Sequence, residues 1–302
     1  MQKHLTFALH FLNLWGLRRK KFLLLHYDEK WFWGLVLRRN AKACKELGIE
    51  RTNLKAFHKG HINKTMGIAV VGAAFEGSLL NGCTGVKVAF ARSQMPKVAD
   101  RMVRGVRERG DVYIVDCAVT GSSYGTVDDP KFPLEDFFRV TVFPEIDSLV
   151  RPGGRYEGYT PVIQGDNAGP HESGTFQTYV KDYCDGMGWH WEPQAPQMPH
   201  ANVCDLSVFP NMSKRHSELA RGIGGLKVLS KDETWGAAEK VWGQLDSPSI
   251  ASGFIHCHKI LEKVREVNGK NDFLGSGGSI HFGVRKGLEQ VPLGLVPKVE
   301  GP

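Results

Sequence analysis

The pattern of apolar and polar positions opens on predicted strands and closes on predicted helices. Apolar and aromatic residues fill 22–36, 65–75 and 82–90 without a helical repeat, which is typical of strands buried on both faces. A shorter apolar run begins after Pro161 and stops on an acid, and residues 189–192 could add one more short strand. The sequence therefore predicts a sheet whose central strands are covered on two sides.

Helices are predicted between and after these strands. The favoured helical ranges are 5–17, 137–150, 175–184, 231–245 and 249–267. One more helix should begin near Asn202, a good N-cap residue, and Asp205 stands where the acid of a capping box would stand. Pro210 should interrupt or kink this helix, because proline has no backbone N–H to donate. Ser230 and Glu233 form a second capping-box pattern.

The order of these elements is three strands, a helix, a strand, a helix, a short strand and then helices. This order predicts a mixed α/β fold, in which antiparallel hairpins open the sheet and parallel crossovers follow. Residues 92–135 alternate basic and acidic clusters with Gly and Ser, so we expect an inserted segment there. Within it, 112–115 could form a short strand, and four arginines could line one edge of a helix: Arg101, Arg104, Arg107 and Arg109.

Length and composition set bounds on the kind of protein. The chain has 302 residues, of which 41% are apolar, enough for one large or two modest domains. Its six cysteines show no paired spacing, which argues against a zinc module or a disulfide framework and fits a reducing compartment. The apolar run 5–17 follows Lys3 as in a signal peptide, but His10 and Asn13 interrupt it. The run is also too short to span a bilayer, so we expect an amphipathic helix and no membrane segment.

The net charge of +7 is unevenly distributed along the chain. Residues 1–64 carry 14 Lys and Arg against 4 Asp and Glu, a net +10, whereas residues 65–302 carry 25 against 28, a net −3. A basic segment of this kind either forms a solvated face or contacts the phosphates of a nucleic acid. The candidates for contact with a DNA backbone, which could also form a nuclear-import signal, are Arg18, Arg19, Lys20 and Lys21.

Three aspartates occupy positions that would suit a metal site. Asp28 lies inside the first strand-like run, Asp166 ends the run after Pro161, and Asp205 opens a helix. Each also has a plainer interpretation, since an aspartate at a strand end is commonly a turn former. Three converging carboxylates repel one another and attract cations, and a site without His or Cys selects Mg²⁺ or Mn²⁺. Two such ions about 4 Å apart would stabilise the entering and leaving oxygens of a phosphoryl transfer. Beside a basic surface, this suggests a nucleic-acid phosphodiester as the substrate.

Several stretches of the sequence resemble mariner-like transposases, which belong to the DDE/DDD superfamily with a ribonuclease H-like fold. The run His-Tyr-Asp-Glu-Lys-Trp-Phe at 26–32 resembles the first-acid motif, and residues 64–72 resemble the strand that follows it. The run Gln-Gly-Asp-Asn-Ala-Gly-Pro-His at 164–171 is similar to the second-acid motif, and residues 197–209 are similar to the third. The resemblance covers roughly residues 5–295.

The resemblance implies an enzyme that cleaves and transfers DNA strands by two-metal phosphoryl transfer. Asp28, Asp166 and Asp205 would bind two Mg²⁺ or Mn²⁺ ions, and Asn167 and His171 would be supporting residues. The 38 residues between Asp166 and Asp205 are compatible with the aspartate-ending branch of the family. The implied partners are DNA, which means transposon ends in the intact family, and a second copy of the chain. The implied location is the nucleus.

The resemblance also suggests a division of the chain into three parts. These are a basic linker helix at 1–21, a ribonuclease H-like catalytic domain at 22–229 with its insertion at about 92–135, and a C-terminal helical extension at 230–302. Only about 25 residues precede Asp28, so we expect the helix-turn-helix modules of the family to be missing.

The chain departs from the family's motifs at three places. Residues 198–202 differ from the usual Ser-Pro-Asp-Leu-Asn, Gly165 replaces a usual polar residue, and Pro210 falls where the family's helix continues. These changes leave open a catalytically decayed or host-adopted domain that binds nucleic acid or a partner without cutting.

Two other metal-site interpretations were weighed against the triad. A binuclear metallophosphoesterase would use residues 165–167 and His171, but the further histidine motifs of those enzymes are missing. A zinc site at 256–258 is disfavoured because neighbouring residues on a helix point apart.

Overall fold

The computed structural model describes residues 2–15, 20–34, 62–165, 174–196, 198–224 and 228–269. At its centre is a five-stranded sheet in the order β3-β2-β1-β8-β9. The strands are β1 (Lys21–Trp33), β2 (Lys64–Glu76), β3 (Thr84–Arg92), β8 (Thr160–Gly165) and β9 (His190–Pro193). β2 pairs antiparallel with both β1 and β3, whereas β8 pairs parallel with both β1 and β9. The predicted mixed sheet, with antiparallel hairpins first and parallel crossovers after them, is confirmed.

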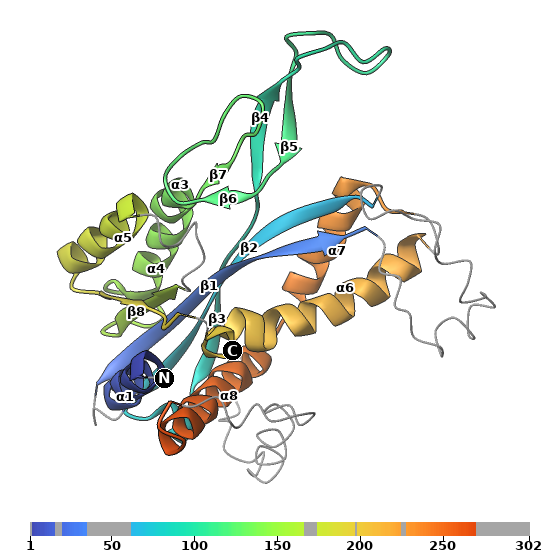
Figure 1. Cartoon of the computed structure of the whole chain (residues 1–302). Coiled ribbons are helices and arrows are strands. Elements are labelled where there is room, and N and C mark those ends of the chain that lie inside the picture. Colours follow the sequence, from blue (N-terminus) through green and yellow to red (C-terminus); the bar gives the residue numbers. More distant parts are fainter. Residues whose placement is uncertain are drawn as a thin grey trace.

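Both faces of the sheet are buried, as the apolar runs predicted. Side chains alternate between the two faces along β1, so Leu24 and Phe32 pack on one face while Leu23 and Tyr27 pack on the other. The first face, here called the α8 face, is covered by α1 (Gln2–Trp15), α6 (Phe209–Gly224), α7 (Lys231–Gly243) and α8 (Ser247–Glu266). The second face is covered by α3 (Leu134–Phe137), α4 (Phe143–Val150) and α5 (Gly174–Met187). Figure 1 shows these two helical layers on either side of the sheet.

The helices begin and end close to the predicted ranges, and their caps explain why. In α7 the Ser230 side chain accepts a hydrogen bond from the Glu233 N–H while the Glu233 side chain accepts one from the Ser230 N–H, which confirms the predicted capping box. In α8 the Asp246 side chain accepts a hydrogen bond from the Ser249 N–H at 2.8 Å. No helix in the described part of the chain is long and apolar enough to cross a membrane.

Two helices contain a π-helical turn that ends at the valine of a Val-Phe-Pro sequence. η4 (Phe138–Val142) joins α3 to α4, and η6 (Cys204–Val208) leads into α6. Pro144 and Pro210 follow these turns as the second residue of α4 and of α6. Proline cannot donate to the carbonyl four residues back and its ring crowds that carbonyl, and a widened turn relieves both problems. The helical run therefore continues through Pro210, so the predicted interruption is wrong, and a widened turn accommodates the proline.

The inserted segment forms a hairpin that projects from the sheet (Figure 1). Its strands are β4 (Gln94–Val98) and β5 (Val112–Asp116), which pair antiparallel. The predicted strand at 112–115 is confirmed, but the predicted helix with an arginine edge is wrong. Val103 instead pairs with Arg107 around Gly105, whose φ of +72° lies outside the helical region. Two further short strands, β6 (Val119–Thr120) and β7 (Phe132–Pro133), pair parallel beside the hairpin.

A buried ion pair anchors the base of this hairpin. Arg92 at the end of β3 donates from Nε to Asp116 Oδ1 at 2.6 Å and from Nη2 to Asp116 Oδ2 at 3.0 Å. Thr65 of β2 donates to Asp116 Oδ1 at 2.7 Å, and Arg92 Nη1 reaches Asp232 of α7 at 2.7 Å. Burial alone would raise the pKa of Asp116, but the hydrogen bonds from Arg92 and Thr65 outweigh burial and lower it. The hairpin, the sheet and α7 are thus joined at one point.

Candidate active site

Asp28 lies toward the C-terminal end of β1 on the α8 face, because it alternates with Tyr27, which packs on the opposite face. The residue is only 6% exposed, and its Oδ1 accepts a hydrogen bond from the Glu29 N–H at 2.7 Å. On the same face, Lys30 Nζ lies 5.6 Å from the centre of the Phe209 ring in α6. Burying a carboxylate is costly unless charges or donors compensate for the lost water, so this position suits a cation.

Asp205 lies in η6 and its side chain is exposed. Asn202 Oδ1 accepts a hydrogen bond from the Cys204 N–H at 3.0 Å, which confirms Asn202 as the predicted capping residue. The other half of the predicted capping box is wrong, because the Asn202 N–H donates to the Pro199 carbonyl at 3.1 Å and not to Asp205. The cap therefore does not hold the Asp205 carboxylate.

β8 ends at Gly165, and its last pair with β1 joins Gln164 to His26. Gly165 lies against the Tyr27 ring so closely that an added Cβ would clash with Tyr27 Oη. This close approach explains why glycine stands at 165. The predicted site residues that follow in the sequence, Asp166, Asn167 and His171, lie outside the described residues.

Three buried polar side chains join the elements around Asp28 and Asp205. We call them the polar bridge: His26 of β1, Gln164 of β8 and Asn202, which precedes η6. Each is 1% exposed. They lie on the α8 face, where the His26 ring meets Phe254 of α8 with its centre 4.9 Å away.

His26 and Asn202 connect η6 directly to β1. His26 Nδ1 accepts a hydrogen bond from the Val203 N–H at 3.0 Å, and Asn202 Nδ2 donates to the Tyr27 carbonyl at 3.0 Å. Burial lowers the pKa of His26 to about 3, so the imidazole is neutral. Since Nδ1 accepts, the ring proton is on Nε2.

Gln164 makes the corresponding connection from β8. Its Nε2 donates to the Ala201 carbonyl at 2.8 Å and lies 3.3 Å from Gln194 Oε1. The polar bridge is not among the sites predicted from the sequence, although the sequence carries a signal for it. His26 stands two positions before Asp28 inside an apolar strand and so shares its face.

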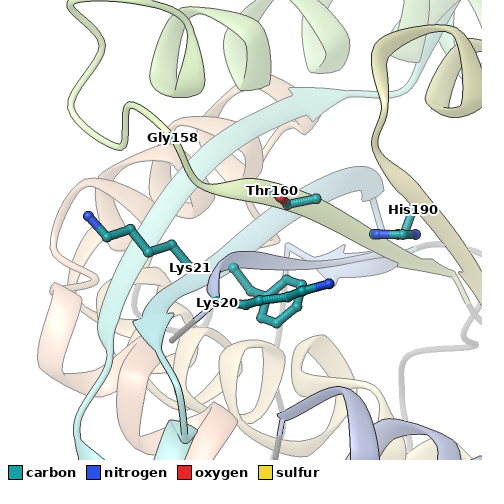
Figure 2. A pocket seen from close by; sticks show the side chains of 6 residues that line it. Lys20, Lys21, Gly158, Thr160 and His190 are labelled. Atoms are coloured by element: carbon teal, nitrogen blue, oxygen red, sulfur yellow. The ribbon is translucent and has the colours of Figure 1, made fainter. Parts of the chain in front are cut away.

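The opposite ends of β1 and β8 carry the part of the basic cluster that the structure describes. Figure 2 shows a pocket lined by Lys20, Lys21, Phe22, Gly158, Thr160 and His190, in which the side chain of Lys20 extends toward the His190 side and that of Lys21 extends away from it. Both lysines are exposed. Arg18 and Arg19 lie outside the described residues. Asp28 is seven positions after Lys21 along β1, which corresponds to about 23 Å at the usual rise of a strand.

The alternative zinc site on α8 is not supported. His256, Cys257 and His258 are buried, and Cys257 Sγ donates to the Ala201 carbonyl at 3.5 Å. Burial raises the pKa of Cys257 to about 12. Within the described ranges, no group of three or more His, Cys, Asp or Glu could hold a metal ion. Those ranges include Asp28 and Asp205 but not Asp166.

The sheet defines the class of fold. Three antiparallel strands are followed by two parallel ones in the order β3-β2-β1-β8-β9, with helices on both faces. This is a ribonuclease H-like fold, with one acid on the central strand and another at the start of a helix on the same face.

Comparison with solved structures finds the expected similarity to mariner transposases at the level of fold. The chain is similar to the catalytic domain of Mos1 mariner transposase, with a TM-score of 0.47 and 14% identity over 89% of this chain and 93% of that one. It is also similar to Mos1 in a paired-end complex with Mg, with a TM-score of 0.49, 12% identity, 89% of this chain and 62% of that one. A pre-cleavage Mos1 transpososome matches with a TM-score of 0.48 and 12% identity, and the match covers 89% of this chain and 63% of that one. No protein-family model and no curated protein sequence matches the chain.

Proposed function

We propose that this chain is a DDD-type transposase catalytic domain that cleaves and transfers DNA strands. Asp28, Asp166 and Asp205 would hold two Mg²⁺ or Mn²⁺ ions, with Asn167 and His171 as supporting residues. The observation that carries the proposal is the attachment of the Asp205 turn to β1 next to Asp28, through the hydrogen bonds of His26 and Asn202.

The placement of the strands supports the same assignment. β8 pairs parallel with β1, and this pairing stops at His26 and Gln164, two residues before Asp28 on β1. Val162 and Gln164 of β8 face the same side as Asp28, and in the sequence Asp166 stands two positions after Gln164. In the chain, Asp166 is the next residue after Gly165, which lies against the Tyr27 ring.

The donor set fits hard divalent cations. Asp28 and Asp205 offer carboxylate oxygens, which Mg²⁺ and Mn²⁺ prefer. Such ions, when bound, supply Lewis-acid stabilisation of phosphate oxygens and a water or hydroxyl nucleophile of lowered pKa. Asp28 is buried in the sheet, whereas the side chain of Asp205 is exposed. Lys30 shares the face of Asp28 and would contact an oxygen of the scissile phosphate.

A nicking assay tests the proposed reaction. Supercoiled plasmid incubated with the protein and Mn²⁺ should become nicked, and Asp28→Asn or Asp205→Asn should lower the rate by at least about 100-fold, the upper range for losing even an outer-shell partner of a metal site. Asp185→Asn is the matched control, because it removes one carboxylate charge from an exposed residue of α5. Nicking by Asp28→Asn at the wild-type rate would refute the assignment. DNA binding by the wild type without any nicking would favour the non-cutting alternative.

DNA is the proposed macromolecular partner, with the nucleus as the place of action. The similar Mos1 structures include a paired-end complex with the left transposon end, and for this chain we propose DNA binding by a homodimer. Arg18, Arg19, Lys20 and Lys21 would contact phosphates, which supply affinity without sequence information. Binding should therefore weaken steeply as salt rises. Equal affinity for duplex DNA and for a polyanion without a helical backbone would argue against a dedicated DNA surface.

A further inference from the structure

We propose that His26, Gln164 and Asn202 are positioning residues, which fix the turn that carries Asp205 against the middle of β1 and the C-terminal end of β8. The catalytic meaning of this inference rests on the proposed function. The contacts themselves do not depend on it.

The burial of these side chains calls for a physical reason. A polar group removed from water costs free energy unless hydrogen bonds replace its lost water contacts. Three such groups, each 1% exposed, lie on a sheet face that is otherwise packed with apolar side chains. Apolar residues would fill the same volume without that requirement. Hydrogen bonds add direction, so a buried polar network can select one arrangement of its neighbours where apolar packing tolerates several.

The bonds are placed where they control the start of η6. The first N–H groups of a helix have no partner within the helix. Here the N–H of Val203 donates to His26 Nδ1 and the N–H of Cys204 donates to Asn202 Oδ1. A strand residue thus acts as a cap for the helix from across the core, and Asp205 follows in the next position after Cys204.

The remaining bonds reach the middle of β1 and the last residues of β8. The pairing of β1 with β8 stops at His26 and Gln164, and Asn202 Nδ2 donates to the carbonyl of Tyr27, the next residue of β1. Gln164 donates to the Ala201 carbonyl, just before the cap. The segment 201–203 is therefore attached to both strands at the level where their pairing ends.

The offsets along the sequence give these contacts their functional meaning. His26 precedes Asp28 by two residues, Gln164 precedes Asp166 by two, and Asn202 precedes Asp205 by three. A hydrogen bond two or three residues from an acid leaves few backbone torsions between the fixed point and the carboxylate. The polar bridge would therefore set the spacing of Asp28 and Asp205 before any ion binds, as outer-shell partners do in metal sites.

Amide hydrogen exchange tests the bridge without reference to metal or activity. His26→Leu removes the acceptor at Nδ1, whereas His26→Asn keeps an acceptor atom at nearly the same position. We expect exchange of the Val203 amide to speed up by about 5- to 10-fold or more in His26→Leu, the worth of one hydrogen bond, and to stay near wild type in His26→Asn. Equal protection of Val203 in both variants would overturn the role of His26.

Mn²⁺ affinity, measured as free Mn²⁺ by electron paramagnetic resonance, tests the consequence for the site. Gln164→Met keeps the length of the side chain and loses its hydrogen bonds. Asn202→Ser keeps a good N-cap but cannot reach Tyr27. Both variants should bind Mn²⁺ about 10- to 100-fold more weakly, the range for outer-shell partners. Thr234→Val is the control, because it removes a buried hydroxyl that donates to the Ser230 carbonyl at 2.7 Å in α7, away from the bridge.

The two readouts separate the possible failures. Wild-type Mn²⁺ affinity in folded Gln164→Met and Asn202→Ser would overturn the positioning role. Loss of affinity in Thr234→Val to the same degree would also overturn it, since general destabilisation would then explain the result. A wild-type protein that binds no Mn²⁺ would refute the proposed function, and the Val203 exchange result would still decide whether the bridge holds the turn.

Discussion

Replacing Asp116 by Asn should destabilise the protein strongly, because it breaks the buried ion pair at the base of the β4–β5 hairpin. The Asp116 side chain is 3% exposed and that of Arg92 is 12% exposed. In Asp116→Asn the oxygen can still accept from Thr65 and from Arg92 Nε, but the amide nitrogen would face Arg92 Nη2 and Lys231 as another donor. Arg92 would keep only Asp232, whose side chain is 90% exposed, as a charged partner.

The expected magnitude follows from this loss of partners. Breaking a buried ion pair by removing one charge costs about 3–5 kcal/mol, and the retained oxygen contacts place this variant near the lower end, at about 3 kcal/mol. For a chain of this size each kcal/mol lowers the Tm by about 2–4 °C, so we expect a decrease of about 6–12 °C. Calorimetry or thermal unfolding followed by circular dichroism at pH 7 measures it.

Two comparisons make the result decisive. Asp185→Asn removes the charge of an exposed ion pair with Lys181 on α5 and should not change the Tm measurably. The pKa of Asp116 is lowered below its ordinary value of 3.8, so its contribution is fully present above about pH 4 and is lost as the pH falls further. The difference between wild type and Asp116→Asn should therefore shrink below pH 4. If Asp116→Asn lowers the Tm no more than Asp185→Asn does, desolvation cancels the pair and the reasoning is wrong.

Three further perturbations have defined outcomes. Burial lowers the pKa of His258 to about 4, so the free energy of unfolding should fall as the pH drops from about 6.5 toward 4, by at most about 1.4 kcal/mol per pH unit. In His258→Gln, the free energy of unfolding measured in urea should depend less steeply on pH over this range. Gly165→Ala should cost about 1–3 kcal/mol because its Cβ meets the Tyr27 ring; if adding Tyr27→Phe recovers none of the loss of Tm, the clash with Oη is not its cause. Lys20→Ala with Lys21→Ala should reduce the slope of log affinity against log salt for duplex DNA by about 1–2; an unchanged slope in fluorescence anisotropy titrations would remove both lysines from the DNA surface.

Local sequence chemistry predicted several elements closely. The cap of α7 depends on a side chain and a backbone N–H only three residues apart, Ser230 and Glu233, so it is readable without knowledge of the rest of the fold. The central strand β1 is apolar at most positions on both faces, a pattern that only a covered strand can satisfy. The arginine spacing in the insertion was misread as helical, because periodicity alone does not register the positive φ of Gly105.

The sequence by itself determined the order of the strands and helices, the buried character of β1 and β2, and the positions of Asp28 and Asp205 on a strand and at a helix start. Only the tertiary structure decided that His26, Gln164 and Asn202 join β1, β8 and the start of η6. The bonds from Gln164 to Ala201, from Asn202 to Tyr27 and from Val203 to His26 connect residues that are 37 to 177 positions apart. It also decided that Asn202 caps its helix without engaging Asp205. The physical reason is that propensity and capping act within a few residues, whereas the partner of a buried polar group is set by which distant backbone the folded sheet brings within hydrogen-bonding distance.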